Sequence, residues 1–286
     1  MPAETPTMVA RKSLGERFGT LLLVAPVMIF IIAVFIVPLV RMAWLSISDP
    51  KLSLDNYVML FSSALYAKSM LRTFLISLSV TLICIFLAYP LAYYAATRGN
   101  LWGRFLLIAA ALSFWISFIV RTYAWLVILG NRGPVIDILK TVGFEPAPRV
   151  LFTTTATMIG LTHILLPYMI LALYSVMTKI DGNLGRAALS LGATPFRSFI
   201  KVYFPLTLPG LVNGCVLVFI FCLGFYVTPA LLGSPRDLMV AGLIATEVQD
   251  LLQWGLASAM AMLLLAITVT LLTIYDRLIG LDRLWG

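Results

Sequence analysis

Long stretches without a single charged residue are the feature that most limits how this chain can fold. No Asp, Glu, Lys or Arg occurs between Arg17 and Arg41, Arg72 and Arg98, Arg149 and Lys179, Lys201 and Arg236, or Asp250 and Asp276. A charge in hydrocarbon costs several kcal/mol, and a helix needs about 20 apolar residues to cross a bilayer. Each stretch therefore predicts one membrane-spanning helix.

A sixth span is predicted over 105–129, where Arg121 is the only charged residue. The composition agrees with a membrane protein, because 61% of the residues are hydrophobic and 11% are charged, against about 25% charged in soluble domains. We expect an all-α, polytopic fold with six transmembrane helices, at 20–40, 72–98, 105–129, 151–177, 207–232 and 251–275. Residues 20–275 are expected to form one transmembrane domain, with polar tails at 1–19 and 276–286.

The distribution of Lys and Arg predicts the orientation in the membrane. The two tails and the loops at 98–104 and 179–201 carry 11 basic residues, and the loops on the opposite side carry 8. Basic residues are enriched in cytoplasmic loops. We therefore expect both termini, and the 179–205 loop, in the cytoplasm. The net charge of +8 is an orientation signal on this reading and does not indicate nucleic-acid binding.

The chain has few residues suited to catalysis or metal binding. Its one histidine, His163, and its three cysteines, Cys84, Cys215 and Cys222, all fall within predicted spans, and the cysteine spacing matches no metal site. The sequence also has no Gly-x-x-x-x-Gly-Lys-Ser/Thr phosphate loop. We expect no enzymatic activity, no catalytic residues, no cofactor and no metal.

A polar segment at 181–210 interrupts the apolar sequence and predicts two short helices. Leu184, Ala187, Ala188 and Leu191 lie at i, i+3, i+4 and i+7, which places them on one shallow helix face. Gly192 suits the left-handed residue that ends such a helix. Thr194 and Pro195 suit the cap and first position of the next helix.

The pattern after Pro195 places Phe196 on an apolar face of the second short helix. Pro205 is expected to mark the start of the next span. A bent pair of helices between two spans would lie along the membrane and present a small apolar face to a cytoplasmic partner. The pattern alone also fits an amphipathic interfacial loop without any partner.

The same segment resembles the cytoplasmic Glu-Ala-Ala signature of ABC importer permeases. The similarity is carried by Ala187-Ala188, Gly192 and Phe204-Pro205-Leu206, and the position of the family's Glu is occupied by Arg186. Other segments resemble the spermidine/putrescine branch of that family. They are Leu54-Asp-Asn-Tyr57, Phe114 to Trp125, Leu165-Leu-Pro-Tyr168 and Phe225 to Gly233, and the resemblance covers roughly residues 20–275.

The resemblance implies a type I ABC importer permease of the bacterial inner membrane that translocates a polyamine. It implies an ABC ATPase dimer, a second homologous permease and a periplasmic or lipid-anchored substrate-binding protein as partners, besides the membrane lipids. The ATPase-coupling residues it implies are Leu184, Arg186, Ala187, Ala188, Leu191, Gly192, Phe196 and Pro205. The guanidinium of Arg186 reverses the usual charge, so the contact of the family's Glu does not carry over.

Carboxylates and aromatic rings near the outer side are the candidates for a path that holds a cationic solute. They are Tyr123, Trp125, Phe225, Tyr226, Glu247, Asp250 and Trp254. The same residues also fit an interfacial aromatic belt with solvated loop acids. For Arg121, the sequence allows a side chain that reaches the outer headgroups, an ion pair, or a place in the path.

Two other classes of protein compete with this interpretation. An ion-coupled secondary transporter of small organic cations would usually carry ionisable residues near the middle of the membrane, and the charge-free stretches disfavour it. A membrane-embedded enzyme would need a nucleophile with a base, or a metal cluster, and neither is evident in the sequence.

Overall fold

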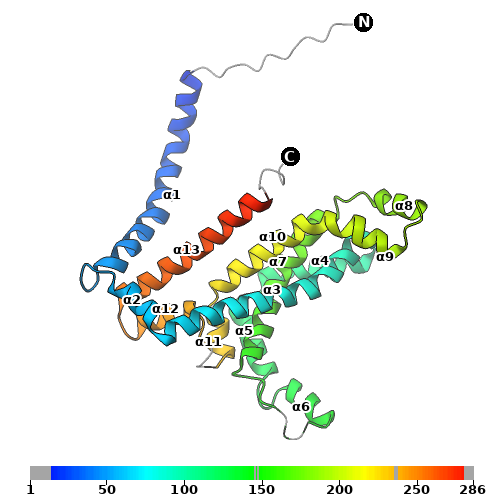
Figure 1. Cartoon of the computed structure of the whole chain (residues 1–286). Coiled ribbons are helices and arrows are strands. Elements are labelled where there is room, and N and C mark those ends of the chain that lie inside the picture. Colours follow the sequence, from blue (N-terminus) through cyan, green and yellow to red (C-terminus); the bar gives the residue numbers. More distant parts are fainter. Residues whose placement is uncertain (1–13, 145, 147, 235–237, 280–286) are drawn as a thin grey trace.

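A computed structural model describes residues 14–144, 146, 148–234 and 238–279, and all regular secondary structure in these residues is helical (Figure 1). Among the described residues, five helices are long and apolar enough to cross a membrane. Four of them lie in α1 (Leu14–Ser48), α3 (Ala64–Arg98), α7 (Thr154–Met177) and α13 (Trp254–Ile279). The fifth is Pro195–Leu223, and α10 (Phe204–Leu223) is its larger part. Residues 1–13 of the predicted N-terminal tail and 280–286 of the C-terminal tail lie outside the described residues.

The third predicted span is not one straight helix. It consists of α4 (Leu101–Leu112), the 3-10 turn η1 (Ser113–Trp115) and α5 (Phe118–Ile128), and its two halves are bent by 104°. The break arises because Ile116 and Ser117 adopt extended ψ angles of 122° and 134°. The sequence offers no proline or glycine there to mark the break, and the bent pair still counts as a sixth candidate span if both halves cross the membrane together.

The fifth predicted span also ends early. Helix α10 stops at Leu223, the chain turns, and the short helix α11 (Val227–Leu232) packs against α5 and α7. A further helix, α12 (Val240–Gln249), lies in a segment that we expected to be a loop, and it packs against α13 and α3. Both differences occur on the side of the molecule opposite the 181–210 segment (Figure 1).

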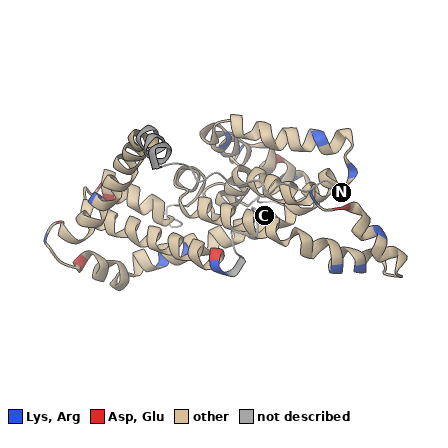
Figure 2. Ribbon diagram, turned by 90° about the horizontal axis from the view of Figure 1, so that it is seen from above, with Lys and Arg blue, Asp and Glu red and all other residues tan. Residues whose placement is uncertain are grey.

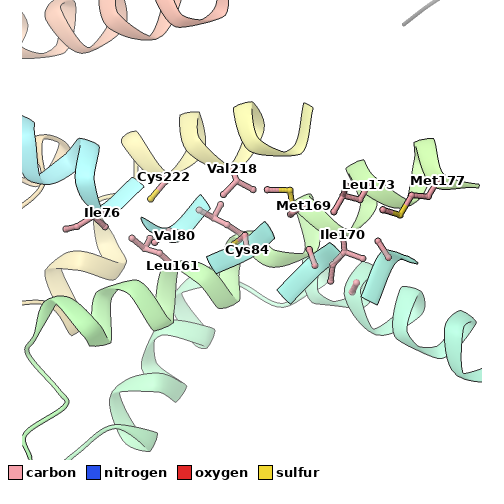
Figure 3. Close-up of a cluster of buried hydrophobic side chains, with 14 of the residues drawn as sticks. Ile76, Val80, Cys84, Leu161, Met169, Ile170, Leu173, Met177, Val218 and Cys222 are labelled. Atoms are coloured by element: carbon pink, nitrogen blue, oxygen red, sulfur yellow. The ribbon is translucent and has the colours of Figure 1, made fainter. Parts of the chain in front are cut away.

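The main core lies where α3, α7 and α10 pack together (Figure 3). Buried side chains from all three helices fill it, among them Val80, Leu165 and Val218. Small residues allow α7 and α10 to approach closely, because a Cβ on Gly210 would lie 2.9 Å from Cβ of Val176. Close approach at small residues is how spanning helices associate without a hydrophobic driving force between them.

A second group of helices consists of α1, α13, α12 and the short α2 (Asp55–Ser62). The end of α1 meets the start of α13, where the Gly255 amide donates to Asp49 Oδ2 at 2.9 Å. The two long helices are therefore antiparallel, and their Leu14 and Ile279 ends lie on the same side of the molecule (Figure 1). Most described side chains of α1 are exposed.

Short helices occupy the two ends of the bundle. Helices α8 (Gly182–Ser190) and α9 (Pro195–Ser198) lie at one end with the π-helical turn η2 (Phe199–Tyr203), and α6 (Pro134–Thr141) lies well away from them (Figure 1). The first short helix predicted in the 181–210 segment is confirmed as α8. The second begins at Pro195 as predicted, but it is not separate from the next span, because Pro195–Leu223 form one helix through α9, η2 and α10. Figure 2 shows that the charged residues lie mostly near the ends of helices, with long uncharged stretches between them.

Candidate functional site

Local hydrogen bonds shape the segment that contains α8 and α9. The Asp181 carboxylate caps α8 by accepting from the Asn183 amide at 2.9 Å. Gly192 ends the helix region with a φ of +85°, a conformation that glycine adopts without a steric penalty. Thr194 Oγ1 accepts from the Arg197 amide at 3.3 Å at the start of α9, and Pro195 is its first residue. The roles predicted for Gly192, Thr194 and Pro195 are confirmed.

One side of α8 faces the rest of the molecule. The buried Ser198 hydroxyl donates to the Gly185 carbonyl at 3.2 Å, and a Cβ on Gly185 would lie 3.8 Å from Ser198 Oγ. Gly182, Gly185, Arg186 and Leu189 share this side at helical spacing and line a groove of about 360 Å³ beside the end of α3. The absence of a side chain at Gly185 lets α8 lie close to α9.

Most of the face predicted to dock points the other way, although Leu184 also lines the groove. At 100° per residue, the centre of the Leu184, Ala187, Ala188 and Leu191 face lies opposite the centre of the groove side. Leu191 is 89% exposed, Leu184 and Ala187 are exposed, and Ala188 is half-buried. Phe196, on α9, is 71% exposed. No residue of α8 is buried. An apolar surface of this kind is typical of an interaction site.

Arg186 lies apart from this face. Arg186 lines the groove with Asp181, Tyr93 and Thr97. The guanidinium of Arg186 makes no hydrogen bond or ion pair with another described residue. Pro205 is the second residue of α10 and is exposed. Because Arg186 lies on the groove side of α8, the replacement of the family's Glu by Arg affects that side. The small residues of the apolar face are unchanged.

A second site is a cavity of about 670 Å³ beside the break between α4 and α5. Phe225 and Tyr226, two of the predicted path residues, line it. Four aromatic residues that were not predicted also line it, and they are Phe114, Phe118, Tyr168 and Phe221. Their ring centroids lie close, at 4.7 Å for Phe114 and Tyr168 and 6.1 Å for Phe118 and Phe225.

Arg121 is the one charged residue that lines this cavity. Its Nη1 donates to Ser113 Oγ at 3.0 Å, across the break between α4 and α5, and its buried Nε has no partner among the described residues. The side chain does not extend away from the protein towards headgroups. The sequence signals that marked this site were the charge of Arg121 within an apolar run and the aromatic residues Phe225 and Tyr226.

The other predicted path residues lie elsewhere. Trp125 packs edge-on against His163 at 5.7 Å, and Tyr123 and Asp250 are exposed. Glu247 is only 3% exposed, and Tyr66 donates a hydrogen bond of 2.9 Å to its Oε1. Trp254 lines a separate cavity of about 660 Å³ with Arg41 and Asp49. The structure thus brings Phe225 and Tyr226 together and separates them from the other five.

Curated relatives are similar to most of this chain, although no protein-family model matches it. The chain is 35% identical over 227 residues to the spermidine/putrescine transport system permease protein PotB of Haemophilus influenzae, covering 79% of each protein. It is 32% identical to PotB of Escherichia coli strain K12, covering 79% of the chain and 82% of PotB. It is 30% identical to the inner membrane ABC transporter permease protein YdcU of the same strain, over 82% of the chain and 79% of YdcU.

Solved structures show the same fold at low sequence identity. A chain of the bacterial alginate ABC transporter, in complex with an alginate pentasaccharide-bound periplasmic protein, matches with a TM-score of 0.73 and 15% identity, over 92% of this chain and 94% of that one. A chain of the inward-facing MetNI methionine ABC transporter matches with a TM-score of 0.57 and 17% identity, over 77% of this chain and 95% of that one.

Proposed function

This chain belongs to the family of ABC importer permeases that includes the PotB spermidine/putrescine proteins, and from that premise we propose that its substrate is a polyamine. It is a permease subunit of the inner membrane rather than an enzyme, and it works with a substrate-binding protein and a separate ATPase. The identity of 35% over 79% of the chain is the observation that carries the substrate assignment.

The cavity at the α4–α5 break is lined mostly by aromatic and aliphatic side chains, which suit the methylene groups of a polyamine. An ammonium group that reached the face of one of these rings would gain about 0.5–2 kcal/mol. The Arg121 guanidinium opposes a cation in the same space. A solute that is attracted by the rings and repelled by Arg121 binds weakly, which suits a transport path because the solute must also leave.

The apolar face of Leu184, Ala187, Ala188 and Leu191 is the surface that we assign to the ATPase. Three features support this assignment: Ala187 and Leu191 are exposed and do not line the groove, the face includes the small side chains of Ala187 and Ala188, and Gly192 and Thr194 hold it on a defined bend. Because α8 is stiff and short, movement of an ATPase bound to it displaces the start of α10. ATP-driven closure of the ATPase dimer would in this way open the transport path to one side of the membrane and then to the other.

A second permease and a defined orientation complete the proposal. Helix α1 contacts mainly α13 and α2 and leaves most of its described surface to its surroundings, which suits a lateral partner together with lipid. The antiparallel packing of α1 and α13 supports placing both termini on one side, and the basic loops support the cytoplasm as that side.

Reconstitution of the complete importer in proteoliposomes tests this function against the ion-coupled alternative. We expect uptake of radiolabelled putrescine or spermidine that requires internal ATP, the binding protein and both permeases, and that persists when an uncoupler removes the proton gradient. Uptake that needs the gradient, or that continues without the ATPase, would support the ion-coupled transporter. If the importer takes up the binding protein's ligand with ATP but takes up no polyamine, only the assignment of a polyamine as the substrate is contradicted.

A further inference from the structure

A cluster of five aromatic side chains lies between the α8–α9 segment and the core bundle. This aromatic junction consists of Tyr89 and Tyr93 of α3, Phe199 and Tyr203 of η2, and Phe204 of α10. Tyr93 meets Phe199 at 5.5 Å and Tyr203 at 5.1 Å between ring centroids, and both contacts are edge-on. Tyr89 meets Phe199 at 6.2 Å and Phe204 at 6.0 Å. Each ring of η2 therefore touches α3.

The ring contacts of the aromatic junction connect α3 to the α8–α9 segment, although the two are not adjacent in the sequence. The chain links α8 and α9 directly only to α7 on one side and α10 on the other. Helix α3 is separated from them in the sequence by the bent pair α4–α5 and by α7, and it is a central member of the core through Val80, Cys84 and Ala88. Ring contacts from Tyr89 and Tyr93 therefore join the end of α3 to the segment that carries the docking face.

Two further observations indicate that the junction is suited to rearrangement. The turn η2 is π-helical, and such turns occur frequently at functional sites. The Tyr203 hydroxyl is buried and has no hydrogen-bond partner within the described part of the chain, whereas the Tyr89 and Thr207 hydroxyls share a hydrogen bond of 3.1 Å. A buried donor without a partner is unfavourable, so an arrangement that supplies one lowers the free energy of the junction.

We infer that Tyr93 and Phe199 are positioning residues that transmit movement of α8 to the cytoplasmic end of α3. A push on α8 reaches η2 through the Ser198–Gly185 hydrogen bond and then reaches α3 through the rings. Without those rings, α8 can shift while the end of α3 stays in place. This inference rests on the proposed docking of the ATPase to α8.

Hydrogen–deuterium exchange of the complete importer tests the inference without any assumption about the substrate. Exchange is compared between the nucleotide-free complex and the complex trapped with ATP and vanadate. In the wild type, we expect trapping to change exchange in residues 182–190 and in residues 88–98. In Tyr93→Leu and in Phe199→Leu, we expect the change at 182–190 to persist and most of the change at 88–98 to be lost.

Matched variants separate the ring from the rest of the side chain. Tyr93→Phe keeps the ring and should restore the change at 88–98. Tyr94→Leu removes a neighbouring tyrosine whose hydroxyl accepts from Asn100 at 2.8 Å and which lies outside the junction, so it should behave as wild type. Tyr93 is 37% exposed, so its truncation leaves little buried space.

The outcomes distinguish this inference from the docking proposal. Suppose that trapping changes exchange at 182–190 in the wild type, and that both leucine variants show the same change at 88–98 as the wild type. This result would leave the docking proposal in place and overturn the inference. Loss of the 182–190 change in those variants would also overturn it, because the rings would then serve docking. A wild-type importer without any change at 182–190 would overturn the docking proposal and the inference with it.

Discussion

At the scale of single residues, two kinds of position decide how this chain packs: glycines at helix contacts and polar groups buried among apolar ones. Gly210 lies against Val176 and the Ala172 carbonyl, so its missing side chain sets the distance between α7 and α10. Tyr66 and Glu247 form a buried polar pair between α3 and α12. Sequence inspection placed Glu247 either in the solute path or among solvated loop acids, since nothing local shows that Tyr66 lies beside it.

Gly210→Ala should destabilise the protein, although alanine is the better helix former by about 1 kcal/mol. The added Cβ would lie 2.9 Å from Cβ of Val176 and 3.1 Å from the Ala172 carbonyl oxygen, and overpacking of this kind costs about 1–3 kcal/mol. Gly182→Ala is the matched control, because a Cβ there meets no atom within 4 Å. Thermal unfolding in detergent should show a lower Tm for the first variant only; equal Tm values would contradict the packing.

Tyr66→Phe should also destabilise the fold, by about 1–3 kcal/mol, because it leaves the buried Glu247 carboxylate without its hydrogen bond. Replacing the carboxylate as well, in Tyr66→Phe with Glu247→Leu, should recover stability, since no buried charge is then left unpaired. A Tm for the double variant below that of Tyr66→Phe would show that the pair is not the cause.

At the scale of elements, regular periodicity was predictable and interruptions in apolar sequence were not. The caps of α8 and α9 follow from Thr194, Pro195 and Gly192, whose preferences are local. The break at Ile116 and Ser117 has no such signal, because its geometry depends on tertiary contacts such as Arg121 with Ser113. For the same reason, Phe225 and Tyr226 were found by residue type, whereas the other rings of their cavity were not.

Gly192→Pro should weaken the complex with the ATPase without removing the permease from the membrane. Proline requires a φ near −65°, and Gly192 has a φ of +85°, so the substitution changes the angle between α8 and α9. Gly143→Pro is a matched control, since Gly143 also has a positive φ of +98° but follows α6, away from α8. Co-purification with the ATPase measures the effect; equal recovery with both variants would contradict the role of the bend.

At the scale of the whole molecule, this permease subunit depends on a separate subunit for ATP hydrolysis. Three helices, α3, α7 and α10, form a packed core, and α8 with α9 extends from one end of it (Figure 1). The α4–α5 break and its aromatic cavity lie along this core. Movement imposed at α8 therefore has a mechanical route towards the helices that line the cavity.

Labelling of one cysteine tests this arrangement most directly. In Leu191→Cys, a membrane-impermeant maleimide is applied to inside-out vesicles that contain the importer with or without its ATPase. The native cysteines lie in α3 and α10 and provide the background in the unsubstituted protein. We predict strong labelling without the ATPase and protection when it is present. Labelling only in right-side-out vesicles, or equal labelling with and without the ATPase, would contradict a permease driven from the cytoplasm through α8.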